Sequence, residues 1–176
     1  MKLKKSFRIP LGFLFGFIYM WRAEPTIVSF LAGAILMVLG VLIRFISSGS
    51  LKKFEGVSRS GIYAYTRNPL YIGSFILGIG ACIMGKDPYF TALFTVSFPL
   101  YYARVIKREE KWLIGMYGEP YEAYIREVPR LIPRHFSLRK ILAETETARA
   151  IKNYDHHAIY GVIAVWIIIG LKMFFL

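Results

Sequence analysis

Five apolar runs dominate this sequence, and the longest of them approach the roughly 20 residues that a helix needs to cross a bilayer. Hydrophobic residues make up 56% of the chain and aromatic residues 16%, more than a water-soluble domain usually carries. We therefore expect an all-α fold, a polytopic membrane helical bundle of about five transmembrane helices. The predicted helices cover Ile9–Trp21, Ile27–Ser47, Leu70–Gly85, Tyr89–Ile106 and Tyr160–Leu176.

The length of 176 residues suits one domain, and we expect a single integral-membrane domain over residues 1–176. The basic start and the first apolar run resemble a signal peptide. However, no small-residue cleavage site follows, because the run ends in Trp21, Arg22, Ala23, Glu24 and Pro25. We expect this run to be retained as the first membrane helix.

The basic residues predict the orientation in the membrane. The formal net charge is +12, but the basic residues flank the apolar runs, which favours contact with membrane lipids over nucleic-acid binding. Eighteen basic residues lie in the N-terminus and in segments 48–69 and 107–157, against two in the short turns, Arg22 and Lys86. The positive-inside rule therefore predicts a cytoplasmic N-terminus, two cytoplasmic long loops and an outside C-terminus. The second loop also predicts amphipathic helices at Tyr121–Val128 and Ser137–Lys152.

Polar residues crowd the boundaries of the third and fourth runs. The stretch YAYTRNPLYIG, Tyr63–Gly73, stands at the entrance to the third run, and ARVIKREEKW, Ala103–Trp112, follows the fourth. Only Lys86, Asp87 and Pro88 separate the two runs, so they form a helical hairpin. The hairpin should bring the two polar stretches side by side.

These stretches carry groups that bind a small polar ligand. Arg67 and Asn68 can hydrogen-bond a carboxylate or a purine edge. Pro69 at the first helical position leaves backbone N–H groups free at the positive end of the helix dipole. Tyrosine rings can stack on a base or face a cation.

The paired carboxylates Glu109 and Glu110 add acceptors for an ammonium group or a ribose diol. S-adenosylmethionine would use all of these groups. A nucleotide or an anionic lipid would use many of them, so the residues alone leave these alternatives open.

The same stretches resemble the isoprenylcysteine carboxyl methyltransferase family, part of a broader group of membrane methyltransferases that includes phospholipid N-methyltransferases. The resemblance covers about residues 50–134. The motifs of the family occur in order on this chain. They are G-x-Y-x-x-x-R-H-P-x-Y-x-G, a paired-glutamate segment, F-G-x-x-Y-x-x-Y and V-P-R. The matching residues are Gly61, Tyr63, Arg67, Pro69, Tyr71, Gly73, Glu109, Glu110, Leu113, Gly118, Tyr121, Tyr124, Val128, Pro129 and Arg130.

The resemblance implies S-adenosyl-L-methionine as cofactor and assigns roles to individual residues. Arg104 or Arg108 would face the methyl acceptor near the membrane boundary, as the catalytic residues. The implied cofactor-binding residues are Tyr63, Arg67, Asn68, Pro69, Tyr71, Glu109 and Glu110. Two positions depart from the family: Asn68 replaces histidine and Tyr117 replaces phenylalanine. Asparagine does not titrate, which excludes a general base at residue 68.

The sequence therefore predicts a methyltransferase that acts on a lipophilic acceptor, with a prenylated cysteine carboxylate as the family namesake. A phospholipid amine, or another small lipophilic carboxylate, amine or thiol, is equally permitted. A non-catalytic module that binds anionic lipid is the alternative from another class, and the paired glutamates argue against it. We expect no metal, because Asp155, His156 and His157 have no partner cluster. The oligomeric state and the role of residues 137–176 are open.

Overall fold

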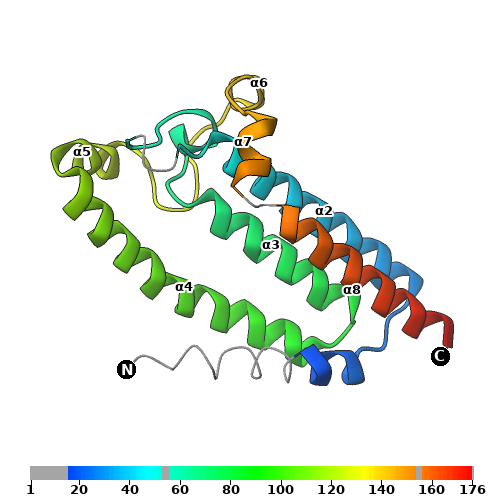
Figure 1. The fold of residues 1–176 in the computed structure, drawn as a ribbon. Coiled ribbons are helices and arrows are strands. Elements are labelled where there is room, and N and C mark those ends of the chain that lie inside the picture. Colours follow the sequence, from blue (N-terminus) through cyan, green and yellow to red (C-terminus); the bar gives the residue numbers. More distant parts are fainter. Residues whose placement is uncertain (1–15, 53–55, 154–155, 176) are drawn as a thin grey trace.

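The computed structural model describes residues 16–52, 56–153 and 156–175, and every regular element in these ranges is helical (Figure 1). Residues 16–22 form a first helix. The long helices that follow are α2 (Ile27–Ser50), α3 (Pro69–Met84), α4 (Pro88–Tyr117) and α8 (His156–Phe175). The short elements are η1 (Gly61–Ala64), α5 (Glu119–Glu127), α6 (Leu138–Ala143) and α7 (Thr147–Lys152). The all-α prediction is confirmed.

Two of these helices are long and apolar enough to cross a bilayer, by length and composition. They are Ile27–Ser50 and residues Ala158–Phe175 of α8, and only 17% and 11% of their apolar windows are buried. A core helix of a soluble protein would be mostly covered, so the outward-facing apolar side chains suit a lipid surround. Helix α3, with 16 residues, is apolar but shorter. Residues 9–15 of the predicted first span lie outside the described residues.

Helices α2 and α3 pack along their whole length, because glycines let the two backbones approach. A Cβ added at Gly40 would lie 2.7 Å from the Gly73 carbonyl oxygen, and one at Gly33 would lie 2.5 Å from that of Gly80. Small residues at such crossings allow apolar helices to associate closely without polar side chains. Helix α8 lies beside α2, and the shared core includes Met37, Met84 and Ile169 (Figure 1).

Arg44 is the charged residue within α2, and it faces α3. Its Nη1 donates to the Ser74 hydroxyl at 2.6 Å. Its aliphatic part packs against Gly73, where an added Cβ would lie 2.7 Å from Arg44 Cγ. Arg44 therefore joins α2 to α3 instead of extending outward to lipid headgroups.

Helix α4 is longer than the predicted fourth run Tyr89–Ile106. Asp87 caps its start, accepting from the N–H groups of Tyr89 and Phe90, and the helix then continues through Pro99 to Tyr117. The basic and acidic residues that follow the apolar run thus stand on a helix and not on a loop.

The predicted amphipathic helix Ser137–Lys152 is wrong as one element, because two short helices, α6 and α7, replace it. The break falls at Glu144–Glu146, where polar groups bond to other segments. The Glu144 carboxylate accepts from Gly61 N–H, and Glu146 N–H donates to Gly49 O at 3.3 Å. The Glu146 N–H thus bonds to α2 instead of to Leu142 O, the bond that would continue one helix.

The polar elements η1, α5, α6 and α7 gather at one end of the bundle, beside the end of α2 and the start of α3 (Figure 1). The opposite end is closed by polar contacts: Arg22 pairs with Asp87 at 2.6 Å, and Lys172 of α8 donates to Met20 O at 2.6 Å. Both long polar segments therefore lie on the same side, as the hairpin argument requires.

The substitution Gly40→Ala should destabilise the protein by about 1–3 kcal/mol, because the new Cβ meets backbone atoms of α3 that cannot turn away. Gly115→Ala is the matched control, since nothing lies within 4 Å of a Cβ there and alanine favours a helix. Thermal denaturation in detergent measures both variants. Equal stability of the two would contradict the close packing of α2 on α3.

Candidate functional site

The two polar stretches meet at the mouth of the α3–α4 hairpin. Tyr71, in the first turn of α3, donates its hydroxyl hydrogen to Glu109 Oε1 of α4 at 2.8 Å. The Tyr71 ring also packs against Tyr102, with ring centroids 4.7 Å apart. The predicted proximity of the two stretches is confirmed.

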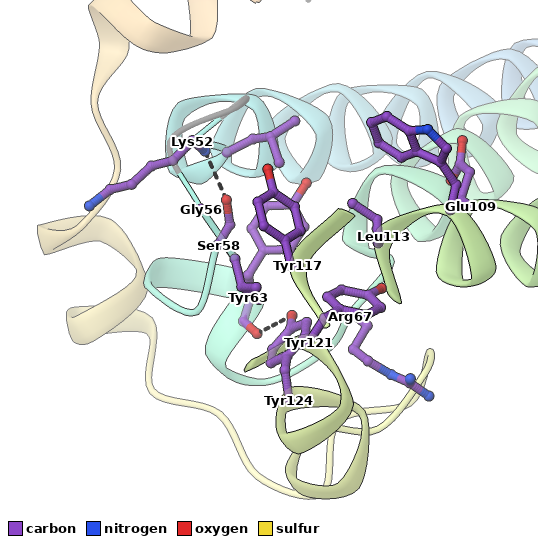
Figure 2. Close-up of a pocket in the computed structure, with 13 residues that line it drawn as sticks. Lys52, Gly56, Ser58, Tyr63, Arg67, Glu109, Leu113, Tyr117, Tyr121 and Tyr124 are labelled. Atoms are coloured by element: carbon purple, nitrogen blue, oxygen red, sulfur yellow. Dashed lines mark hydrogen bonds between the residues drawn. The ribbon is translucent and has the colours of Figure 1, made fainter. Parts of the chain in front are cut away.

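A cavity of about 360 Å³ opens beside this contact (Figure 2). Its size falls at the lower end of the range of about 300–1,000 Å³ that is typical of small-molecule sites. Aromatic side chains form a large part of the walls, and three charged residues, Lys52, Arg67 and Glu109, join them. The aromatic lining residues are Tyr63, Trp112, Tyr117, Tyr121 and Tyr124.

The tyrosines of η1 and α5 form one face of the cavity. Tyr63 and Tyr124 are buried, and the Tyr124 hydroxyl donates to the Tyr63 carbonyl oxygen at 2.8 Å (Figure 2). Burial, and then the charge of Glu110, raises the pKa of Tyr121 to about 12, and burial also raises the pKa of Tyr124. Both phenols are therefore neutral at physiological pH and offer ring faces rather than proton acceptors.

Glu110 is turned away from the cavity into an ion cluster with two arginines. Its side chain is only 9% exposed, and Arg130 holds both carboxylate oxygens at 2.6 and 3.2 Å. Arg67 Nη1 lies 3.1 Å from Glu110 Oε1. The hydrogen bonds that Arg130 donates to Glu110 raise the pKa of Arg130. The structure gives Glu110 an internal partner set, and its predicted contact with the cofactor stays a prediction.

Arg67 is the most enclosed cation at the cavity. Its side chain is 7% exposed, yet its Nε and Nη1 make no hydrogen bond within the described residues. The contact with Glu110 is thus an ion pair without hydrogen-bond alignment. Both atoms are covered by protein, and the anionic partner of this guanidinium in the structure is Glu110.

Asn68 and Pro69 do not line the cavity. The Asn68 amide donates to Arg130 O at 3.0 Å, and the backbone N–H of Arg67 donates to Pro129 O at 3.0 Å. Pro69 is buried at the first position of α3. These residues hold the segment after α5 against the start of α3, and their predicted contact with the cofactor is not tested.

Arg104 and Arg108 lie one turn apart on the exposed face of α4. Each stands two residues, about 200° of helix rotation, from a buried residue of the packed face, Ile106 or Glu110. Arg104 donates back to Leu100 O at 3.3 Å. The structure does not bring these two arginines to the cavity.

Sequence reasoning missed several cavity residues that a helical-spacing argument could have found. Trp112 and Leu113 follow Glu109 by three and four residues on α4, so they share its face. Arg130 was matched as part of V-P-R but was given no role. Lys52 and Ser58 carry no signal in the sequence, because they reach the cavity through the turn before η1.

No cluster of three histidine, cysteine or acidic side chains with the geometry of a metal site occurs among the described residues. Asp155, which the sequence places beside His156 and His157, lies outside the described residues.

A family profile and several relatives connect this chain with methyltransferases. The profile of the family described as phospholipid methyltransferase matches residues 28–120, over half of the chain. A protein-S-isoprenylcysteine O-methyltransferase of Schizosaccharomyces pombe is 37% identical over 73 residues, which cover 42% of this chain and 31% of that protein. The predicted resemblance is confirmed.

Two relatives carry another name. A methanethiol S-methyltransferase of Crocosphaera subtropica is 38% identical over 40% of this chain and 27% of that protein. Methanethiol S-methyltransferase 2 of Bradyrhizobium diazoefficiens is 31% identical over 69% of this chain and 56% of that protein. The matches thus span from about a quarter to just over half of these relatives. No solved structure matches this chain.

The two adjacent glutamates should respond differently to loss of charge. Glu110→Gln leaves the buried Arg67 without its counter-ion, so we expect a loss of about 3 kcal/mol of stability. Glu109→Gln keeps an oxygen for the Tyr71 hydroxyl at an exposed site and should cost less than about 1 kcal/mol. Thermal denaturation in detergent compares them. A similar loss for both would contradict the structural role of Glu110.

Proposed function

Because this chain belongs to the phospholipid methyltransferase family, we propose that it transfers a methyl group from S-adenosylmethionine to a lipophilic acceptor in the membrane. The observation that carries this proposal is a cavity with aromatic side chains that is lined by both Arg67 and Glu109. This combination of an anion-binding group, a cation-binding group and ring faces suits a zwitterionic nucleoside cofactor.

The residues of the cavity fit that cofactor group by group. Arg67 would hold its carboxylate, and Glu109 would hold its ammonium group or its ribose hydroxyls. The rings of Tyr63, Tyr117 and Tyr121 would stack on the adenine or face the sulfonium charge. The proposed site also includes Asn68, Pro69 and Glu110. They would act on the cofactor indirectly, through the contacts that hold Arg67 and the start of α3.

When bound, the cofactor supplies a methyl group that is already activated by its positive sulfur. The chain then needs to align the acceptor with that group and to exclude water. The aromatic side chains that line the cavity would exclude water from the reacting groups. Asn68 does not titrate, and Tyr121 and Tyr124 remain protonated at physiological pH. These three residues supply no base, which favours an acceptor that arrives as an anion, a carboxylate or a thiolate.

The acceptor class draws support from the relatives, which are named for a prenylated cysteine carboxyl group and for methanethiol. Both names describe acceptors that can become anions. A phospholipid amine is the second candidate, favoured by the description of the family profile. A module that only binds anionic lipid is disfavoured by the exposed Glu109 at the cavity, which repels anionic headgroups.

We propose five membrane spans, with the N-terminus and the polar end of the bundle in the cytoplasm. The cofactor would enter from the cytoplasm and the acceptor from the bilayer. Arg104 and Arg108, exposed on α4, would attract an anionic acceptor at the membrane boundary. They would act on turnover and not on cofactor affinity.

Calorimetry with S-adenosylhomocysteine tests the proposed cofactor site. The purified protein in detergent should show saturable binding, and Glu109→Ala and Tyr71→Ala should each weaken it about tenfold by removing a charged hydrogen bond or its support. Glu122→Ala, on the exposed face of α5, is the matched control and should bind like the wild type. Absence of saturable binding by the wild-type protein would sink the proposal.

Transfer of a labelled methyl group tests the acceptor. Arg104→Ala and Arg108→Ala should keep the affinity for S-adenosylhomocysteine while lowering the rate of transfer about tenfold. A native lipid extract, a prenylated cysteine and a small thiol serve as parallel acceptors. Label that appears only in phospholipid amines would replace the anionic acceptor with the second candidate.

A further inference from the structure

The C-terminal part of the chain packs against the cavity end of the bundle. The last turn of α2 is built of small residues, Ser47, Ser48, Gly49 and Ser50, and all four are buried. A Cβ added at Gly49 would lie 2.7 Å from Thr145 Cγ2 and 2.9 Å from Glu146 O. The end of α2 is therefore shaped to receive the turn between α6 and α7.

Side chains from α7 and the residue after it cap the end of α2. The Asn153 amide donates to Ser48 O at 2.7 Å and to Leu51 O at 3.2 Å, and Arg149 Nη1 lies 3.4 Å from Gly49 O. The last carbonyl groups of a helix lack intrahelical donors, and a positive charge there is favourable. Because no basic residue of α2 itself lies in its last turn, the distant segment supplies this cap.

The same segment fixes the start of η1. The Glu144 carboxylate accepts from the backbone N–H of Gly61, the first residue of η1. Gly61 has a φ of +59°, and a Cβ there would lie 2.3 Å from Ser50 Oγ. The turn is thus tightly constrained by α2 on one side and by Glu144 on the other.

This turn carries part of the cavity wall. Tyr63 lies two residues after Gly61, and its carbonyl oxygen accepts from Tyr124. Leu51 and Lys52, which follow the capped end of α2, line the cavity as well. No residue of segment 138–153 is among those that line the cavity. The segment therefore acts on the cavity through the end of α2 and through η1.

We propose that segment 138–153 supports the cofactor site indirectly, through the end of α2 and through η1, and that Glu144 is a positioning residue for Tyr63. The segment lies outside residues 28–120, the part that matches the family profile, so this support is added by the chain's own C-terminal part. The inference rests on the proposed function for the identity of the ligand. It assigns a role in cofactor affinity to residues for which the sequence motifs give none.

Three variants test this role. Glu144→Ala removes the acceptor for Gly61 N–H, and the dissociation constant for S-adenosylhomocysteine should rise about fivefold. Glu144→Gln keeps an acceptor oxygen and should restore most of the affinity. Glu122→Ala, on the exposed face of α5 and outside segment 138–153, is the matched control for loss of a carboxylate.

Two further readouts separate positioning from general damage. The rate of methyl transfer at saturating cofactor should be unchanged in Glu144→Ala, while its KM for the cofactor rises. Amide hydrogen exchange at residues 61–66 should speed up in Glu144→Ala and not in Glu122→Ala, with or without ligand.

Unchanged affinity and unchanged exchange in Glu144→Ala would overturn the inference, as would a loss that Glu144→Gln fails to restore. If the wild-type protein binds no S-adenosylhomocysteine, the proposed function is wrong and the assignment of Glu144 to a cofactor site falls with it. The exchange result would then still decide whether Glu144 orders η1.

Discussion

The cluster of Glu110 with Arg67 and Arg130 is the interaction on which the polar end of this protein depends. It joins the approach to α3, the far part of α4 and the segment after α5, three parts of the chain that are distant in sequence. Removing the carboxylate of Glu110 is costly, because the buried Arg67 would remain as an uncompensated charge. The cluster therefore fixes where the aromatic residues of η1 and α5 lie relative to the apolar helices.

Much of the site could be predicted from the sequence because one topological argument carried it. A three-residue turn between two apolar runs forces a hairpin, and the bond between Tyr71 and Glu109 is its direct result. The same argument could not separate Glu109 from Glu110, since adjacent residues on a helix differ by about 100° and only packing decides which one faces inward. For the same reason it gives no facing for Arg104 and Arg108, whose predicted role towards the methyl acceptor stays a prediction.

The break between α6 and α7 had a different cause. The stretch around Glu144 has acceptable helix propensity, and only bonds to Gly61 and Gly49 favour a turn there. The sequence predicts Ser47 as the end of an apolar helix and residues 48–50 as the start of a polar segment, whereas α2 continues to Ser50. Its small residues gain a meaning once the partner that packs on them is known, and no local pattern in the sequence identifies that partner.

The continuity of α4 has a consequence for how the site can vary. Glu109 and Glu110 are neighbours on one unbroken helix, so the direction of the carboxylate at the cavity and that of the carboxylate in the ion cluster are fixed relative to each other. Rotating α4 to suit a different ligand would carry Glu110 out of reach of its arginines. Changes of specificity in such a site must therefore come from the residues that face α4 across the cavity, whose side chains can be exchanged while the helix keeps its angular setting.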